Sequence, residues 1–221
     1  MKKLLFVVLA ALLLAHPGKS AAQVQRPRLV VGLVVDQMRW DYLYYYYDQY
    51  RTDGLRRLLD QGYSFQNTLI NYLPAVTAVG HSSIYTGSVP AFTGIVSNNF
   101  YINGRPTYCV SDSTVTPVGT TADEGRMSPR NLLATGIGDM LKMATDGRSK
   151  VIGISLKDRA AILPAGFAAA GAYWWGKKAG HFVTSTYYRN DLPEWVKRVN
   201  REVQVKSGTN VFTSVVGVTK T

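Results

Sequence analysis

Residues 77–98 read TAVGHSSIYTGSVPAFTGIVSN, and the rest of the chain is organised around this stretch. Thr77 is followed by small residues and then by a helix-compatible apolar run that ends at Gly87. Small residues beside a threonine let the backbone turn tightly, and the first N–H groups of a helix lack partners and carry partial positive charge. The stretch therefore predicts an anion-binding helix start that presents Thr77 as a nucleophile. The alternative is that Thr77 only caps the helix.

Two apolar runs, residues 29–35 and 151–155, are rich in β-branched side chains and suit strands that are buried on both faces. Helical patterns lie between them, at residues 54–61 and from Ser128-Pro129 to about Thr145. This alternation of strands and helices predicts an α/β layer fold.

Shorter patterns fill in the remaining elements. Residues 63–70 alternate like a strand, and residues 99–111 suggest a hairpin or a loop, with a turn signal at Asn103-Gly104. Residues 182–188 are a further strand candidate, and a helix is expected after Asp191, with a proline near its first turn.

The first 22 residues are interpreted as a signal peptide. Two lysines precede an apolar segment at residues 4–15, and Ser20-Ala21-Ala22 offers small residues for cleavage. The segment is too short for a typical membrane-spanning helix, so a stable membrane span is not expected. The predicted location is periplasmic or secreted. Cys109 is the only cysteine, which excludes an intrachain disulfide.

The chain is basic, with a formal net charge of +11. The positive residues are scattered, whereas a nucleic-acid site would need a concentrated basic stripe, so we expect no nucleic-acid partner. Two interpretations of the charge remain: a basic surface without a special role, or a field that attracts small anionic substrates.

Polar residues at the ends of the expected elements suggest a common site. Asp36 follows the first apolar run, where open α/β sheets bind ligands, and it could serve as a metal ligand or merely cap the next helix. Lys157 and Arg159 follow the second run, two positions apart, which in an extended segment places both on one side. With Asn98 they suit the oxygens of a phosphoryl group that Thr77 would attack. Singly, each residue also has an ordinary structural explanation.

Five segments together resemble the alkaline phosphatase superfamily, and more narrowly the PafA-type periplasmic alkaline phosphatases related to type I phosphodiesterases and nucleotide pyrophosphatases. They read VGLVVDQMRWDYL (31–43), NTLINYLPAVTAVGHSSIYTGSVP (67–90), GIVSNN (94–99), RMSPRNLLATGIGDMLK (126–142) and VIGISLKDRAAILPAG (151–166). The resemblance implies a three-layer sandwich with a mostly parallel central sheet, incomplete at its C-terminus. It further implies hydrolysis of phosphate monoesters through a phosphothreonine intermediate, with two zinc ions.

Roles for individual residues follow from the same resemblance. Asp36 and Thr77 are implied as zinc ligands, with Thr77 also the nucleophile, and Asn98, Lys157 and Arg159 are implied as contacts to the phosphoryl oxygens. The Lys-x-Arg pair favours monoesters, since relatives that cleave diesters lack it. A phosphodiesterase or nucleotide pyrophosphatase is the alternative within the family.

The sequence also departs from that pattern. The family's other zinc ligands are aspartates and histidines, including an adjacent Asp-His pair, and beyond the leader this chain has only His81 and His181. Residues 23–202 are therefore interpreted as the N-terminal part of a catalytic domain that is inactive alone, and residues 203–221, which lack acidic side chains, as a frameshifted or disordered tail. The alternative is a non-catalytic periplasmic fragment that binds anions. The oligomeric state is left open.

Overall fold

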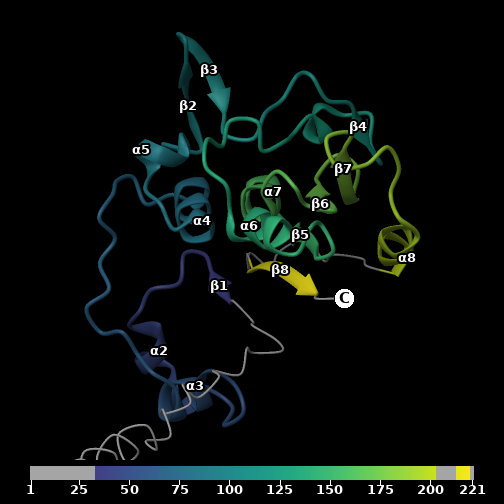
Figure 1. Ribbon diagram of the computed structural model, residues 1–221. Helices are drawn as coiled ribbons and strands as arrows, with labels where there is room; N and C mark the ends of the chain where they lie inside the picture. Colours follow the sequence, from purple (N-terminus) through teal and green to yellow (C-terminus); the bar gives the residue numbers. More distant parts are fainter. Residues whose placement is uncertain (1–32, 203–212, 220–221) are drawn as a thin grey trace, which may run out of the picture. The chain divides into compact units, whose positions relative to one another are not determined.

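The computed structural model describes residues 33–202 and the backbone of residues 213–219 (Figure 1). Three expected features lie wholly or partly outside these ranges. They are the signal peptide at residues 1–22, the start of the first apolar run at residues 29–32, and positions 203–212, 220 and 221 of the tail. Within them, the elements in chain order are β1 Val34–Val35, α2 Tyr42–Tyr45, η1 Tyr47–Gln49, α3 Leu55–Gln61, α4 Thr77–Thr86, α5 Pro90–Thr93, β2 Asn99–Ile102, β3 Arg105–Tyr108, β4 Pro117–Val118, η2 Asp123–Gly125, α6 Ile137–Ala144, β5 Lys150–Ser155, α7 Asp158–Ala165, β6 Gly171–Gly176, β7 His181–Ser185, α8 Glu194–Glu202 and β8 Thr213–Thr219.

Among the described strands, six form one sheet in the order β1-β8-β5-β6-β7-β4, and β2 pairs with β3 in a separate hairpin. β5 and β6 run parallel, with Ser155 opposite Trp174. The other neighbours in the sheet pair antiparallel, so the sheet is mixed where a mostly parallel one was expected. Only residues 177–180 join β6 to β7, and such a short link can connect antiparallel strands but not parallel ones.

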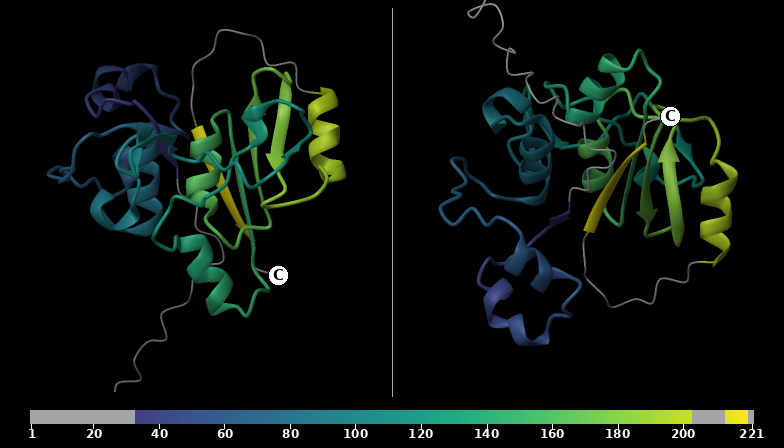
Figure 2. Two further views of the ribbon diagram at one scale, coloured as in Figure 1. Left: turned by 90° about the horizontal axis from the view of Figure 1, so that it is seen from above. Right: turned by 60° about the horizontal axis from the view of Figure 1, so that its bottom comes forward.

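The side chains of β6 alternate between two apolar clusters. Ala172 and Trp174 belong to the larger cluster, together with Ile162 of α7, whereas Tyr173 packs in a smaller cluster with Val196 of α8. Successive side chains of a strand point to opposite faces of the sheet, so the two clusters, with α7 in one and α8 in the other, lie on opposite faces. Figure 2 shows α8 beside β7 at one side of the sheet. This layering confirms the α/β fold class.

α7 lies directly against β5, and this contact positions the candidate site. Residues 160–165 of α7 are all buried. A Cβ atom built on Gly153 of β5 would lie 2.2 Å from the carbonyl oxygen of Ala161, so only glycine permits this approach. The contact fixes the start of α7, and with it Lys157 and Arg159, beside the carboxyl end of β5.

Several expected elements are confirmed. α3 occupies all but the first position of the pattern at 54–61, and β5 contains the second apolar run. The hairpin of β2 and β3 turns at Asn103 and Gly104, whose φ angles of +50° and +75° suit an Asn-Gly turn. β7 begins one residue before the expected strand at 182–188, and α8 follows Pro193.

The expected strand at residues 63–70 was wrong, since these residues form no strand. Tyr63, Phe65 and Leu69 are 84%, 75% and 88% exposed, so the alternation does not correspond to a buried face. The segment is outside the described sheets, and a strand gains stability only through pairing and burial.

The helix expected from Ser128 was also wrong at its start, because α6 begins at Ile137. Ser128 Oγ donates a hydrogen bond to Asp112 Oδ2 at 2.6 Å and accepts one from the backbone of Arg130, so the hydroxyl anchors two distant segments instead of capping a helix. The expected end of the helix is confirmed, since Thr145 is the C-cap of α6.

Candidate active site

Thr77 is the first residue of α4 and is buried. Its hydroxyl Oγ1 donates a hydrogen bond of 3.1 Å to Oδ2 of Asp36, which lies just after β1. Val76, the extended residue before the helix, supplies no side-chain cap, so the first N–H groups of α4 take their acceptors from elsewhere. The structure therefore brings the expected hydroxyl and the expected carboxylate together at a helix N-terminus.

Asn98 lies against the same helix start. Its Oδ1 accepts a hydrogen bond of 3.0 Å from the backbone N–H of Ala78, the second residue of α4. Because an amide side chain accepts only through its oxygen, Nδ2 remains as the donor end of Asn98. The backbone carbonyl of Asn98 accepts from the N–H of Cys109 at 2.9 Å, which ties the residue to the base of the β2–β3 hairpin.

His81 is a buried residue that hydrogen-bonds to the first turn of α4. It is 3% exposed, and its Nδ1 lies 2.9 Å from the carbonyl oxygen of Thr77, to which it donates. Burial lowers the pKa of His81; the charge of Asp36 opposes this shift and that of Arg159 adds to it. A lowered pKa keeps the ring neutral near pH 7. The ring is thus within electrostatic reach of both an acidic and a basic candidate residue.

Lys157 and Arg159 lie at the start of α7. Lys157 is extended, with φ −112° and ψ 135°, but Arg159 is already in the first helical turn, so the two do not share the extended segment that was expected. Burial lowers the pKa of Lys157, and the charges of Lys177 and Arg159 lower it further. The pair therefore sets two positive charges where the carboxyl end of β5 meets the N-terminus of a helix.

Arg159 is held in place by two residues that sequence reasoning did not identify as part of the site. Its Nη1 donates to the phenol oxygen of Tyr108 at 2.8 Å, and that phenol donates to Oδ1 of Asp158 at 2.6 Å. Asp158 lies between Lys157 and Arg159 in the sequence, and this position was the only sequence feature that could have indicated its role. Tyr108 gave no signal, because it lies in a hairpin about fifty positions away.

α4 and α7 pack side by side, and this contact joins the two halves of the site (Figure 1). One half contains Asp36, Thr77 and Asn98 around the start of α4. The other contains Lys157 and Arg159 at the start of α7. The β2–β3 hairpin is bonded to both halves, through Cys109 to Asn98 and through Tyr108 to Arg159.

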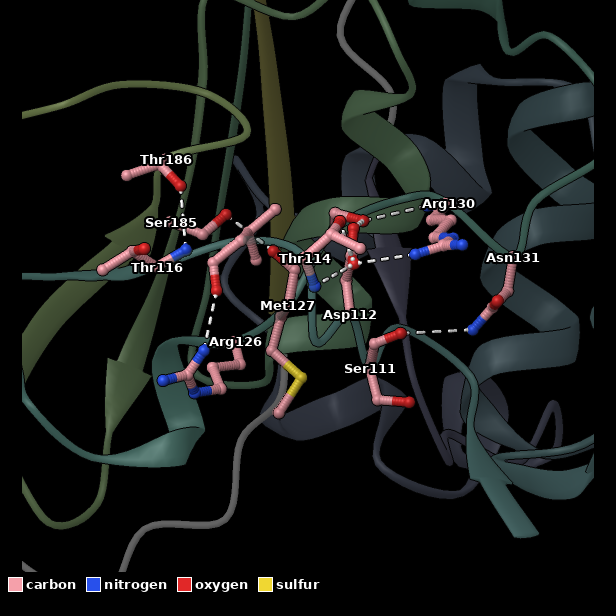
Figure 3. Close-up of polar contacts among 12 residues, drawn as sticks. Ser111, Asp112, Thr114, Thr116, Arg126, Met127, Arg130, Asn131, Ser185 and Thr186 are labelled. Carbon is pink, nitrogen blue, oxygen red and sulfur yellow. Dashed lines mark hydrogen bonds and ion pairs between the residues drawn. The ribbon is translucent and has the colours of Figure 1, made fainter. Parts of the chain in front are cut away.

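A second polar cluster holds the loop that follows this hairpin (Figure 3). Asp112 is its centre: the carboxylate accepts hydrogen bonds from Ser128, from Thr114 and from Arg130. Ser185 of β7 donates to the carbonyl oxygen of Met127 at 2.6 Å, which fastens the loop to the sheet. The cluster holds the loop next to the hairpin base and contains none of the expected site residues.

The donors for a metal ion are few. Asp36 and Thr77 offer a carboxylate and a hydroxyl, but residues 33–202 show no group of three or more His, Cys, Asp or Glu side chains that could hold a metal. A catalytic zinc ion has three protein ligands and an open position. The described part of the chain therefore does not complete the zinc site that the resemblance implies.

The comparison with protein families gives one clear result. The family model described as type I phosphodiesterase / nucleotide pyrophosphatase matches residues 30–217. The match includes Asp36, Thr77, Asn98, Lys157 and Arg159, and it extends into β8.

Individual relatives are similar to this chain over most of its length. The chain is 56% identical over 185 residues to a protein of Myroides odoratus named calcium-transporting ATPase, and 56% identical over 182 residues to alkaline phosphatase PafA of Elizabethkingia meningoseptica. These alignments cover 83% and 81% of this chain but 34% and 33% of the relatives, so the chain spans about a third of their length.

A solved structure agrees with the fold. It is the crystal structure of a PafA variant in which a threonine, an asparagine, a lysine and an arginine are replaced, and it aligns with a TM-score of 0.78 at 53% identity. The alignment covers 81% of this chain and 35% of that one. The described residues therefore adopt part of an alkaline-phosphatase-like fold.

Proposed function

The chain belongs to the type I phosphodiesterase / nucleotide pyrophosphatase family, and from that premise we propose that it carries the nucleophile and the phosphoryl-binding residues of a PafA-type phosphate-monoester hydrolase. The observation that carries the proposal is the hydrogen bond between Thr77 Oγ1 and Asp36 Oδ2 at the start of α4. It holds a hydroxyl at a helix N-terminus, and helix N-termini are common binding sites for phosphate groups.

In the proposed reaction, Thr77 Oγ1 forms a bond to phosphorus while the bond from phosphorus to the ester oxygen breaks. The hydroxyl proton of Thr77 ends on the ester oxygen, which leaves as the alcohol. Water then attacks phosphorus, the bond from Thr77 to phosphorus breaks, the hydroxyl regains a proton and inorganic phosphate is released. Asp36 Oδ2 already accepts the hydrogen bond from the hydroxyl and therefore orients the oxygen that attacks. Splitting one difficult step into two easier ones is the usual benefit of a covalent intermediate.

Asn98, Lys157 and Arg159 are the proposed contacts to the phosphoryl oxygens. The amide of Asn98 has a donor end left once its oxygen binds Ala78 N. A planar guanidinium can bind two oxygens of one phosphoryl group, and an ammonium adds a compact point charge. Two cations suit the terminal group of a monoester, which carries one more charged oxygen than a diester.

The substituted relative supports these assignments. Its four replaced residues follow in the order threonine, asparagine, lysine and arginine, with the last two separated by one residue. Thr77, Asn98, Lys157 and Arg159 have the same order here, and Lys157 and Arg159 are likewise separated by one residue.

Zinc is the proposed metal, with Asp36 and Thr77 as two of its ligands. When bound, it would lower the pKa of a coordinated hydroxyl and stabilise charge on the phosphoryl oxygens. These two residues do not fill a catalytic zinc site, and we assign no step of the reaction to the ion.

Two other functions compete with this proposal. A phosphodiesterase fits the description of the family, but the Lys157 and Arg159 pair favours a monoester. An anion-binding fragment without catalysis would need only the helix start, Asn98 and the two cations.

The proposed location is periplasmic or secreted, on the strength of residues 1–22 of the sequence, and small phosphorylated molecules are the proposed substrates. Within the described ranges, no helix is long and apolar enough to cross a bilayer.

The test is the binding of inorganic phosphate to the purified chain, measured by calorimetry in low salt. We expect Lys157→Ala and Arg159→Ala each to weaken binding by about tenfold, which corresponds to the loss of one charge-assisted hydrogen bond. Lys150→Ala is the matched control, because Lys150 is an exposed cation at the opposite end of β5. Equal losses in all three variants would indicate attraction by net charge alone and would overturn the proposed site.

A further inference from the structure

Two residues hold the guanidinium of Arg159: Tyr108 through a hydrogen bond, and Asp158 through an ion pair of 4.0 Å between Nη1 and Oδ1. Its Nη1 donates to Tyr108 Oη at 2.8 Å, and its Cζ lies 6.0 Å from the centroid of the Tyr108 ring. Its Nε is buried and has no hydrogen-bond partner within the described residues. A buried donor without a partner costs free energy unless a ligand satisfies it. The contact with Tyr108 therefore fixes the group while leaving a donor for something else.

The direction of the hydrogen bonds around Tyr108 is determined by its surroundings. Burial raises the pKa of the Tyr108 phenol, and the neighbouring charge of Asp158 raises it further. The phenol therefore stays protonated and donates its hydrogen to Asp158 Oδ1 at 2.6 Å. Its oxygen lone pairs then remain to accept from Arg159 Nη1. The backbone N–H of Arg159 also donates to Asp158 Oδ1, so the carboxylate holds both partners.

Tyr108 is itself fixed by backbone contacts. It pairs with Asn99 at the open end of the β2–β3 hairpin. The next residue, Cys109, donates from its backbone to the carbonyl of Asn98 and accepts at its own carbonyl from Asn131 Nδ2 at 3.2 Å. The position of the phenol oxygen therefore depends on the same hairpin base that holds Asn98 at the start of α4.

From these contacts we infer that Tyr108 is a positioning residue. Its phenol donates to Asp158 and accepts the hydrogen bond of Arg159, and it thereby holds the guanidinium in the orientation that receives a phosphoryl group. The inference rests on the proposed function, because it assumes that Arg159 binds the substrate's phosphoryl oxygens. Tyr108 does not touch the phosphoryl group. It acts by removing rotational freedom from Arg159 before the substrate arrives, which lowers the entropy cost of binding.

The test combines nuclear magnetic resonance of the arginine side chains with binding of inorganic phosphate. Tyr108→Phe removes the phenol oxygen and keeps the ring. Tyr101→Phe is the control, because Tyr101 lies on the same hairpin and is 73% exposed. Arg159→Lys assigns the resonances of Arg159. We expect slow rotation of the Arg159 Nη groups in the wild-type chain and in Tyr101→Phe, and averaged Nη signals in Tyr108→Phe. We expect phosphate affinity to fall about tenfold in Tyr108→Phe alone.

The outcomes separate this inference from the proposed function. If the wild-type chain binds phosphate and Tyr108→Phe binds it equally well, or if the Arg159 signals do not change, Tyr108 is not a positioning residue. If the wild-type chain does not bind phosphate at all, the proposed function fails, and the inference that rests on it fails too, whatever the arginine signals show. Asp158→Asn is the second variant, and it should free the Arg159 signals as well, because the hold on the phenol weakens and the 4.0 Å ion pair with Arg159 is lost. Equal thermal midpoints of the variants would exclude unfolding as the cause.

Discussion

The carboxylate of Asp36 and the hydroxyl of Thr77 lie 3.1 Å apart although 41 positions separate them in the chain. Each residue stands at the end of a regular element, Asp36 after β1 and Thr77 at the first position of α4. A hydrogen bond between such ends depends on the packing of whole elements and not on local sequence. It is also incomplete as a metal site, because two ligands do not suffice for a catalytic zinc ion.

The first prediction concerns metal content and activity. Because the described residues show no group of three or more His, Cys, Asp or Glu side chains that could hold a metal, we expect the purified chain to retain no stoichiometric pair of zinc ions after gel filtration, as measured by elemental analysis. We also expect negligible hydrolysis of p-nitrophenyl phosphate with added zinc. Robust hydrolysis that disappears in Thr77→Ala and persists in Thr77→Ser would contradict this prediction and would show a complete site in these 221 residues.

The second prediction concerns the contact that sets α7 on β5. In Gly153→Ala, the new methyl group would lie 2.2 Å from the carbonyl oxygen of Ala161, so the helix must move. Overpacking of this kind costs about 3 kcal/mol of unfolding free energy. Urea denaturation measures the loss, and phosphate binding should weaken as well because Lys157 and Arg159 move with α7. The control is Gly80→Ala in α4, where a Cβ atom meets nothing within 4 Å, and where we expect unchanged or slightly raised stability. A stable Gly153→Ala variant would contradict the tight packing of α7 on β5.

The elements that the sequence predicted well are those with local causes. The Asn103-Gly104 turn and the apolar run of β5 depend on neighbouring residues, and both appear as expected. The helix start expected at Ser128 is absent because the hydroxyl of Ser128 binds Asp112, sixteen positions away, and does not cap a helix. Of the candidate site, the helix start at Thr77 and the cations after β5 follow from local sequence. The link from Tyr108 to Arg159 spans 51 positions, and no local pattern could reveal it.

The third prediction concerns Asp139 of α6. Its buried carboxylate accepts hydrogen bonds from the backbone N–H groups of Gly136, Phe167 and Ala168, at 2.9, 2.8 and 2.8 Å. Asp139→Ala would leave these donors without a partner, and we expect a loss of about 3 kcal/mol of unfolding free energy in urea denaturation. Asp123→Ala is the control, since the side chain of Asp123 is 93% exposed and its ion pair contributes little. Similar losses in the two variants would show that the three backbone bonds add no particular stability.

The fourth prediction concerns the dependence of stability on pH. Burial by itself raises the pKa of Asp112, but hydrogen bonds from Ser128, Thr114 and Arg130 outweigh burial and hold that pKa below its ordinary value of 3.8 (Figure 3). A carboxyl group whose pKa is lower in the folded state binds fewer protons there than in the unfolded state. Its contribution to stability is therefore complete above pH 3.8 and is lost as the pH falls through the folded-state pKa.

Urea midpoints of the wild-type chain and of Asp112→Asn, measured from pH 6 down to pH 2.5, test this directly. We expect the variant to be less stable at pH 6 by about 2 kcal/mol, because the side chain loses its charge-assisted hydrogen bonds. The difference should shrink below pH 3.8, where the carboxylate of the wild-type chain begins to be protonated. Asp53→Asn is the control, since that side chain is 69% exposed and pairs only with a neighbouring arginine in an exposed ion pair. A constant difference between wild type and Asp112→Asn across the pH range would mean that Asp112 stabilises the loop through its shape alone and not through its charge.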